Sequence, residues 1–264
     1  MSVPFASLRV LSGCIMNIIE IVEVGTIMIL GGIIQSSVGF GFGLFALPIL
    51  LFFGFDLPAA VIIVIIGSAI QKLTAVRVLS HAFKWKDLFP YMAVGLMSLP
   101  LGVTLMFRLS TLDQSITRQI IGILILLLLL LRWRGAIKTR EHVPPIWGLI
   151  AACCSGLLNG LANIGGPPMV LWVLSHQWPN DKMRVILLAF SLVFVPFQLL
   201  LMLWLFGTPI LSPLGKALLL SPAVLFGTWL GLLIGKRFSP HQLKVYMQTL
   251  LLLIALSSIL KPLF

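Results

Sequence analysis

Long stretches of apolar residues, without a single charged side chain, run through most of the chain. The charge-free stretches cover 24–55, 88–107, 142–180, 185–215 and 217–235, with shorter ones at 57–71, 119–131 and 245–260. A helix needs about 20 apolar residues to cross the hydrocarbon core of a bilayer. Because the runs are continuous, rather than alternating as in membrane β-barrels, the pattern predicts an all-α polytopic membrane protein.

Eight hydrophobic segments follow from this pattern. They are 24–53, 57–80, 88–107, 115–133, 146–177, 184–206, 214–236 and 243–261. The first and the fifth are too long for one straight span at a rise of about 1.5 Å per residue, and both contain Gly or Pro near the middle. We therefore expect these two segments to be broken or re-entrant.

The two overlong segments also resemble each other. The matching pairs, each at an offset of 124 positions, are Gly32–Gly156, Ser36–Gly160, Gly39–Asn163 and Gly41–Gly165. Further on, Pro90–Pro222 and Gly95–Gly227 match at an offset of 132. The chain is thus predicted to contain two repeats. The first is 1–140, with a short N-terminal tail and a basic central loop from 132, and the second is 141–264.

Loop charges bear on the orientation of the repeats. The formal net charge is +11, and the basic loops are 81–87, 132–142, 178–184 and 236–244. Strict alternation of eight spans would place 132–142 and 178–184 on opposite sides, whereas the positive-inside rule favours the cytoplasm for both. The conflict disappears if 142–180 enters and leaves on the same side, which would make the repeats inverted. Basic loops of this kind suit contact with anionic lipid headgroups. We therefore expect the lipid bilayer to be the partner of these loops, and we expect no binding of nucleic acid.

The glycine-rich breaks are the candidate binding site. They read QSSVGFGFG at 35–43 and NGLANIGGPP at 159–168. A break leaves backbone groups that lipid cannot pair, so it is tolerated only inside protein or beside an aqueous cavity. The half-helix after each break presents a positive dipole end, which suits a small anion. The candidate substrate-binding residues are Gln35, Ser36, Ser37, Gly39, Gly41, Gly43, Gln71, Lys72, Asn159, Gly160, Asn163, Gly165, Gly166, Pro167 and Gln198.

Several of these residues have an alternative interpretation. The small residues Ser36 and Gly160, with Gly32 and Gly156, also fit close helix packing. Lys72 is a functional candidate because a buried lysine is costly in a membrane, but its side chain could also reach the interface by snorkelling. Gln198 could hydrogen-bond between helices without touching a substrate.

Two sequence blocks resemble a known family. SSVGFGFGLFALP (36–48) and GLLNGLANIGGPPMVL (156–171) are similar to the paired motifs of the TauE/SafE family of sulfite exporter-like permeases. The resemblance runs from about Gly25 to Leu260, and it implies a two-repeat helical fold that transports sulfite, sulfonates or related organic anions. It places the repeat motifs on Gly39, Gly41, Gly43, Gly160, Asn163, Gly165, Gly166 and Pro167. Phe42 stands where the second copy has Gly166, so we expect it to narrow that half of the pocket.

The positions of the acidic residues argue against several other functions. All seven lie near the ends of segments: Glu20, Glu23, Asp56, Asp87, Asp113, Glu141 and Asp181. Without a mid-membrane carboxylate, a metal-cation carrier and a proton antiporter with an internal Asp pair are disfavoured. An intramembrane enzyme is disfavoured too, because it would need paired acids or a HExxH or GxSxG motif. The three cysteines form no ligand pattern, so neither metal nor cofactor is expected.

The sequence favours a function as a secondary transporter of a small anion. Transport would proceed by alternating access at a site between the two breaks. The resemblance adds that it is an exporter. The alternative is a non-transporting membrane scaffold or assembly factor. We expect a multi-pass protein of the bacterial inner membrane, and the sequence is compatible with a homodimer.

Overall fold

A computed structural model of the chain describes residues 17–38, 41–79, 85–134 and 143–235, with 249, 252 and 253. Within these residues the fold is built from helices: α1 (Ile18–Val38), α2 (Phe42–Phe52), α3 (Leu57–Leu79), α4 (Trp85–Ser110), α5 (Gln114–Arg134), α6 (Pro145–Ala162), α7 (Gly166–Leu174), α8 (Asn180–Phe206), the 3₁₀ turn η2 (Thr208–Ile210), α9 (Leu211–Leu219) and α10 (Ser221–Gly235).

Five of these helices, α1, α3, α4, α6 and α8, are long and apolar enough to cross a membrane, and α9 with α10 could supply a sixth span in the described part of the chain. The chain is therefore an integral, multi-pass membrane protein. The sequence predicted eight segments, whereas the described residues contain five or six helical spans of sufficient length. By the same measure, α2 and α5 are shorter apolar helices.

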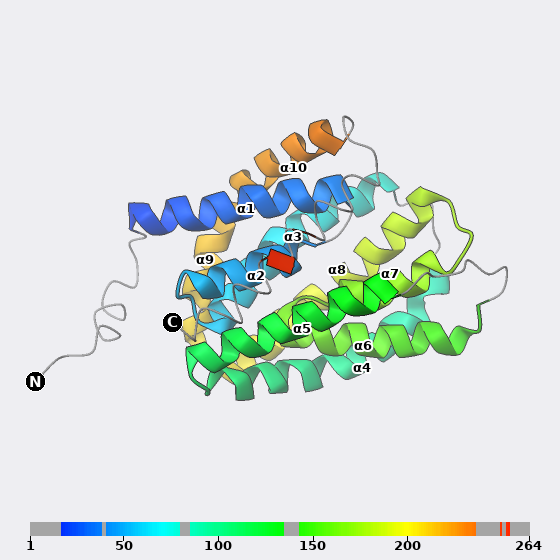
Figure 1. Cartoon of the computed structure of the whole chain (residues 1–264), viewed down its shortest axis with the longest axis horizontal. Helices are drawn as coiled ribbons and strands as arrows, with labels where there is room; N and C mark the ends of the chain where they lie inside the picture. The colour runs from blue at the N-terminus through cyan, green and yellow to red at the C-terminus, as the bar shows by residue number, and fades with distance from the viewer. Residues whose placement is uncertain are drawn as a thin grey trace, which may run out of the picture.

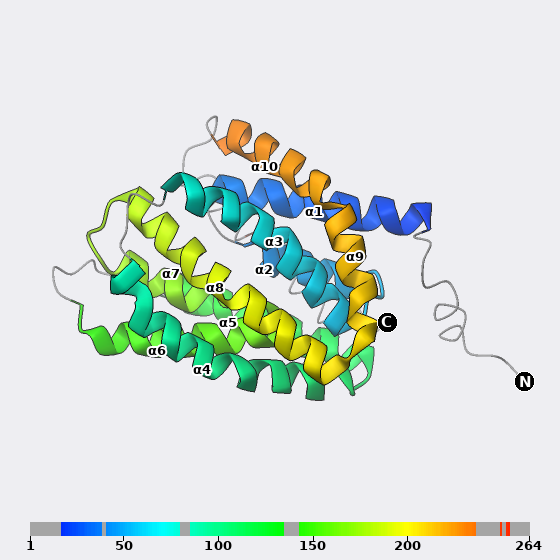
Figure 2. The same cartoon turned by 180° about the vertical axis from the view of Figure 1, so that it is seen from behind.

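The helices form a bundle with two outer pairs (Figures 1 and 2). At one side α1 lies beside α10, at the other α4 lies beside α6, and α3 and α8 cross between them. Each outer pair joins one helix from the first half of the chain to one from the second half. The two halves are therefore packed together along both sides of the bundle, as well as at the centre.

Both overlong segments are divided near their glycine motifs. α1 ends at Val38 and α2 begins at Phe42, while α6 ends at Ala162 and α7 begins at Gly166. In Figure 1, α2 runs back along α1, and α7 runs back along α6. The short helices thereby bring their first turns into the interior of the bundle.

The seventh predicted segment, 214–236, differs from the structure. It is not one helix, because α9 and α10 meet at an angle of 47°. Pro222 lies in the first turn of α10 and has no backbone N–H to donate to the preceding turn, so the helical ladder is interrupted there. The eighth predicted segment, 243–261, lies almost entirely outside the described residues.

Close helix packing explains several of the repeated small residues. A Cβ added at Gly156 or Gly160 would lie under 3.0 Å from backbone atoms of α4, and one at Gly227 would do the same on α1. At Gly32 the added atom would meet the backbone of α10. The packing interpretation of Gly32, Gly156 and Gly160 is therefore confirmed, because only glycine lets these backbones approach so closely.

Candidate functional site

A small cavity lies where the two breaks meet in the middle of the bundle. Its volume is about 60 Å³, which is room for a few water molecules or a small ion rather than a bulky solute. Its walls come from the ends of α1 and α6, the first turns of α2 and α7, and the facing sides of α3 and α8. The lining residues are Gln35, Gly41, Phe42, Gly43, Leu44, Ser68, Lys72, Asn159, Asn163, Ile164, Gly165, Gly166, Pro167, Met169, Val170, Leu187, Leu188, Phe190 and Ser191.

The two breaks touch each other directly at this cavity. Asn163 ends α6 in the left-handed conformation, with φ 53°, and its backbone N–H donates to the Asn159 carbonyl at 2.8 Å. Asparagine tolerates this conformation better than most residues. The carbonyl oxygen of Asn163 faces Gly43 so closely that a Cβ at Gly43 would lie under 3.0 Å from it. Gly43 is thus needed for the contact between the first and second breaks.

A chain of polar side chains connects the second break to α3. Asn163 Nδ2 donates to Ser68 Oγ at 3.2 Å, and Lys72 Nζ donates to the same oxygen at 3.2 Å. Ser68 Oγ in turn donates to the Ile65 carbonyl at 3.1 Å. The hydroxyl therefore holds an amide and an ammonium group at the cavity wall, and both groups have further N–H donors to offer.

The first turn of α2 lies at the cavity wall. Gly41 precedes the helix with φ 112°, a conformation that glycine adopts without strain. The backbone N–H groups that follow it in the first turn have no carbonyl partner one turn earlier in the same helix. α7 offers fewer such donors, because Pro167 and Pro168 lack the N–H.

Asn159 adds a further donor to the wall. Its side chain is only 2% exposed, and its Nδ2 has no hydrogen-bond partner in the described part of the chain. A buried amide without a partner is costly. A group in the cavity that accepts hydrogen bonds would remove this cost, so the wall suits an acceptor such as an oxyanion.

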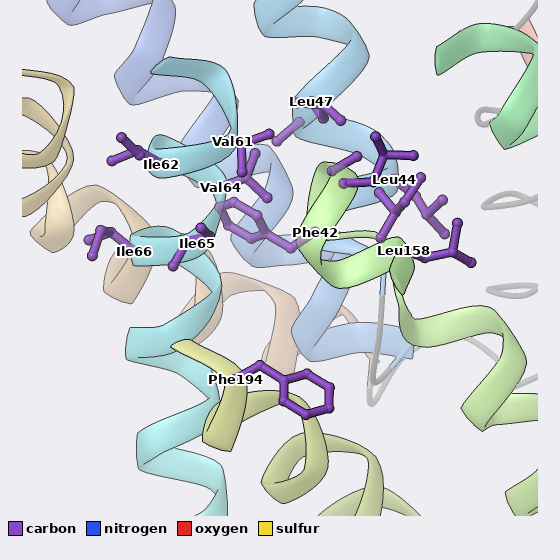
Figure 3. Close-up of a cluster of buried hydrophobic side chains, with 14 of the residues drawn as sticks. Phe42, Leu44, Leu47, Val61, Ile62, Val64, Ile65, Ile66, Leu158 and Phe194 are labelled. Carbon is purple, nitrogen blue, oxygen red and sulfur yellow. The ribbon is translucent and has the colours of Figure 1, made fainter. Parts of the chain in front are cut away.

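The two halves of the cavity differ at one equivalent pair of positions. The Phe42 ring turns from α2 toward α3 (Figure 3) and fills a slot beside Gly31 and Gly67, where an added Cβ would crowd the ring. At Gly166, the matching position 124 residues later, an added Cβ would meet nothing within 4 Å. The open space of the cavity therefore lies beside the first turn of α7.

Nine of the predicted residues line the cavity, and they come from both halves of the chain. They are Gln35, Gly41, Gly43, Lys72, Asn159, Asn163, Gly165, Gly166 and Pro167. Gly39 lies outside the described residues.

Five predicted residues are not among the lining residues, and each contacts a helix backbone instead. Ser36 Oγ donates to the Gly32 carbonyl, and Ser37 Oγ to the Gly231 carbonyl. Gln198 Nε2 donates to the Asn159 carbonyl at 2.6 Å. The other two are Gly160, which packs against α4, and Gln71, which donates to the Gly32 carbonyl and to Thr228 Oγ1.

The residues that the sequence reasoning left out of the site are mostly apolar. Met169, Val170, Leu187, Leu188 and Phe190 line the cavity, yet in sequence they are indistinguishable from core or lipid-facing positions. Ser68 on α3 is a polar lining residue that was omitted from the predicted site. Its spacing could have identified it, because positions i and i+4 share a helix face and Lys72 stands four residues later.

Comparison with known proteins gives one match. The family model for Sulfite exporter TauE/SafE matches residues 24–258, which is most of the chain and includes both breaks and every residue that lines the cavity. No curated protein and no solved structure matches the chain.

Proposed function

Because the chain belongs to the sulfite exporter TauE/SafE family, we propose that it is a secondary transporter that exports a small anion, such as sulfite or a sulfonate, across the bacterial inner membrane. The anion binds in the cavity between the two breaks. The observation that carries this proposal is the chemistry of the cavity wall. Its one charged side chain is Lys72, its other polar side chains are amides and hydroxyls, and carboxylates are absent from the lining residues.

Inverted repeats are part of the same proposal. The two glutamines Gln71 and Gln198 stand on α3 and α8, each in the long helix that follows a broken segment. Each donates to a carbonyl of the first helix of that segment, on α1 and α6 respectively. The outer pairs show the same correspondence: α1 begins the first broken segment and packs against α10, whereas α6 begins the second broken segment and packs against α4. Rocking of one repeat against the other would then expose the cavity alternately to the two sides of the membrane.

Flux into proteoliposomes tests the proposed function. Purified protein is reconstituted, and uptake of radiolabelled sulfite, methanesulfonate, taurine and acetate is measured with and without an internal anion for exchange. We expect uptake of at least one of the sulfur oxyanions. Uptake of none of the panel by protein that is folded and inserted would contradict the proposal and favour the scaffold alternative.

A matched pair of variants assigns the flux to the cavity. Gly166→Leu places a side chain in the open half of the cavity, where nothing lies within 4 Å of an added Cβ, and is expected to abolish uptake. Gly215→Leu makes the same change on α9, also in open space but away from the cavity, and should transport as the wild type does. Equal uptake by both variants would place the transport path elsewhere.

A further inference from the structure

Lys72 is buried at the cavity, and the described part of the chain supplies no counter-ion for it. It is the one charged side chain among the lining residues, and only 7% of its surface is exposed. Its Nζ donates to the neutral Ser68 hydroxyl. Among the described residues the one ion pair within 4.0 Å joins Lys216 to Glu20, at the far end of α1. The hydrogen bond from Lys72 to Ser68 argues against the snorkelling interpretation, because it holds the ammonium group at the cavity wall.

An ammonium group in this position is costly as long as it has no partner. Isolated charges inside a membrane protein are expensive, and they pair with another charge or line an aqueous path. No carboxylate of the described chain lies close enough to neutralise Lys72. The remaining source of negative charge is the transported anion itself, if the cavity is the transport site proposed above.

We infer that Lys72 is the counter-charge of the transported anion, so that the carrier crosses between its two states neutral when loaded and with one positive charge when empty. This inference rests on the proposed function and adds to it which half of the transport cycle senses the membrane potential. The loaded site carries no net charge through the field. The empty site carries the charge of Lys72, so its return is the step that the potential drives or opposes.

Two modes of transport separate these steps. In exchange, an anion is carried in each direction and the empty carrier does not need to reorient. Exchange of a monovalent anion should therefore be independent of the potential. In net uptake the empty site must return outward, and an inside-positive potential should accelerate this step. The expected acceleration is about sevenfold for about 100 mV, if half of the electrical work on one charge acts on the barrier.

The experiment compares the two modes in the same proteoliposomes. The probe is radiolabelled methanesulfonate, a monovalent oxyanion whose charge does not change near neutral pH, and sulfite is the second probe. The potential is set by a potassium gradient with valinomycin. Net uptake that responds to the potential, together with exchange that does not, supports the inference. Exchange that responds as strongly as net uptake would overturn it while leaving the proposed function intact, whereas no wild-type flux of either probe would overturn both.

Variants assign the effect to Lys72. In Lys72→Gln the loaded site carries the uncompensated charge of the anion, so exchange should become sensitive to the potential. If the variant instead no longer binds the anion, methanesulfonate should no longer raise the thermal stability of the protein. Lys72→Arg keeps the charge and should keep exchange insensitive. The control is Lys86→Gln, an exposed lysine on α4, which should behave as the wild type. An active Lys72→Gln protein with potential-independent exchange would refute the assignment.

Discussion

Replacing Gly43 by alanine would test whether the contact between the two breaks sets the geometry of the cavity. The added Cβ would lie under 3.0 Å from the Asn163 carbonyl oxygen, whereas ordinary contacts begin at 3.4 Å. That oxygen belongs to the backbone and cannot rotate away, so the breaks must move apart by about 1 Å. A displacement of about 1 Å at a reacting or binding centre can lower a rate on the order of 100-fold.

The same substitution should leave most of the protein folded. Overpacking of this kind costs about 1–3 kcal/mol, and the higher helix propensity of alanine offsets about 0.5–1 kcal/mol of this cost. We therefore expect Gly43→Ala to insert into membranes, to melt a few degrees below the wild type, and to take up sulfite or methanesulfonate at a small fraction of the wild-type rate. Proteoliposome uptake, normalised to inserted protein, measures the rate, and a thermal unfolding assay in detergent measures stability.

Gly25→Ala provides the control for this prediction. Gly25 is also a buried helical glycine, on α1, but an added Cβ there would meet nothing within 4 Å. Its transport rate should equal that of the wild type. Wild-type uptake by Gly43→Ala would refute the reasoning, because it would mean that the contact between the breaks does not position the cavity wall.

Three further predictions concern stability. Gly227→Ala should lower the free energy of unfolding by about 1–3 kcal/mol, because the added Cβ collides with the backbone of α1; a thermal or denaturant scan beside Gly25→Ala, which should be neutral or slightly stabilising, measures the difference. Gln198→Leu removes the hydrogen bond from α8 to α6 and should destabilise the protein by about 1 kcal/mol in the same scan; an unchanged midpoint would show that this bond contributes nothing. Glu20→Gln breaks the partly exposed pair with Lys216 and should cost less than about 1 kcal/mol, an effect that high salt should erase in the wild type.

The division of the chain into helices follows largely from the sequence. Charged residues are so costly in a bilayer that they mark the ends of the spans, and the charge-free run 185–215 contains most of α8 (Asn180–Phe206). Helix ends at Val38 and Ala162 lie within a few residues of the glycine motifs, because glycine and proline are where a membrane helix can end. The bend before α10 was missed, since Pro222 was interpreted as part of a repeat and not as a point of interruption.

The orientation of polar residues on each helix was harder to predict. Gln71 and Lys72 are neighbours in sequence, yet Lys72 lines the cavity and Gln71 bonds to α1 and α10. In a membrane, both lipid and protein interior are apolar, so the hydrophobic pattern does not tell which face of a helix points inward. The same ambiguity hides the apolar part of the cavity wall, such as Leu187 and Leu188.

Cysteine labelling at Gly166 tests the central claim, that an anion binds between the two breaks and that this site opens to both sides of the membrane. Gly166→Cys is made in a variant lacking the native cysteines, and its open surroundings leave room for the thiol. We expect a charged methanethiosulfonate reagent to label it from either side of inside-out and right-side-out vesicles, and sulfite or methanesulfonate to slow the labelling at concentrations that saturate transport. Labelling from one side only, or at a rate that neither anion changes although both are transported, would contradict the account.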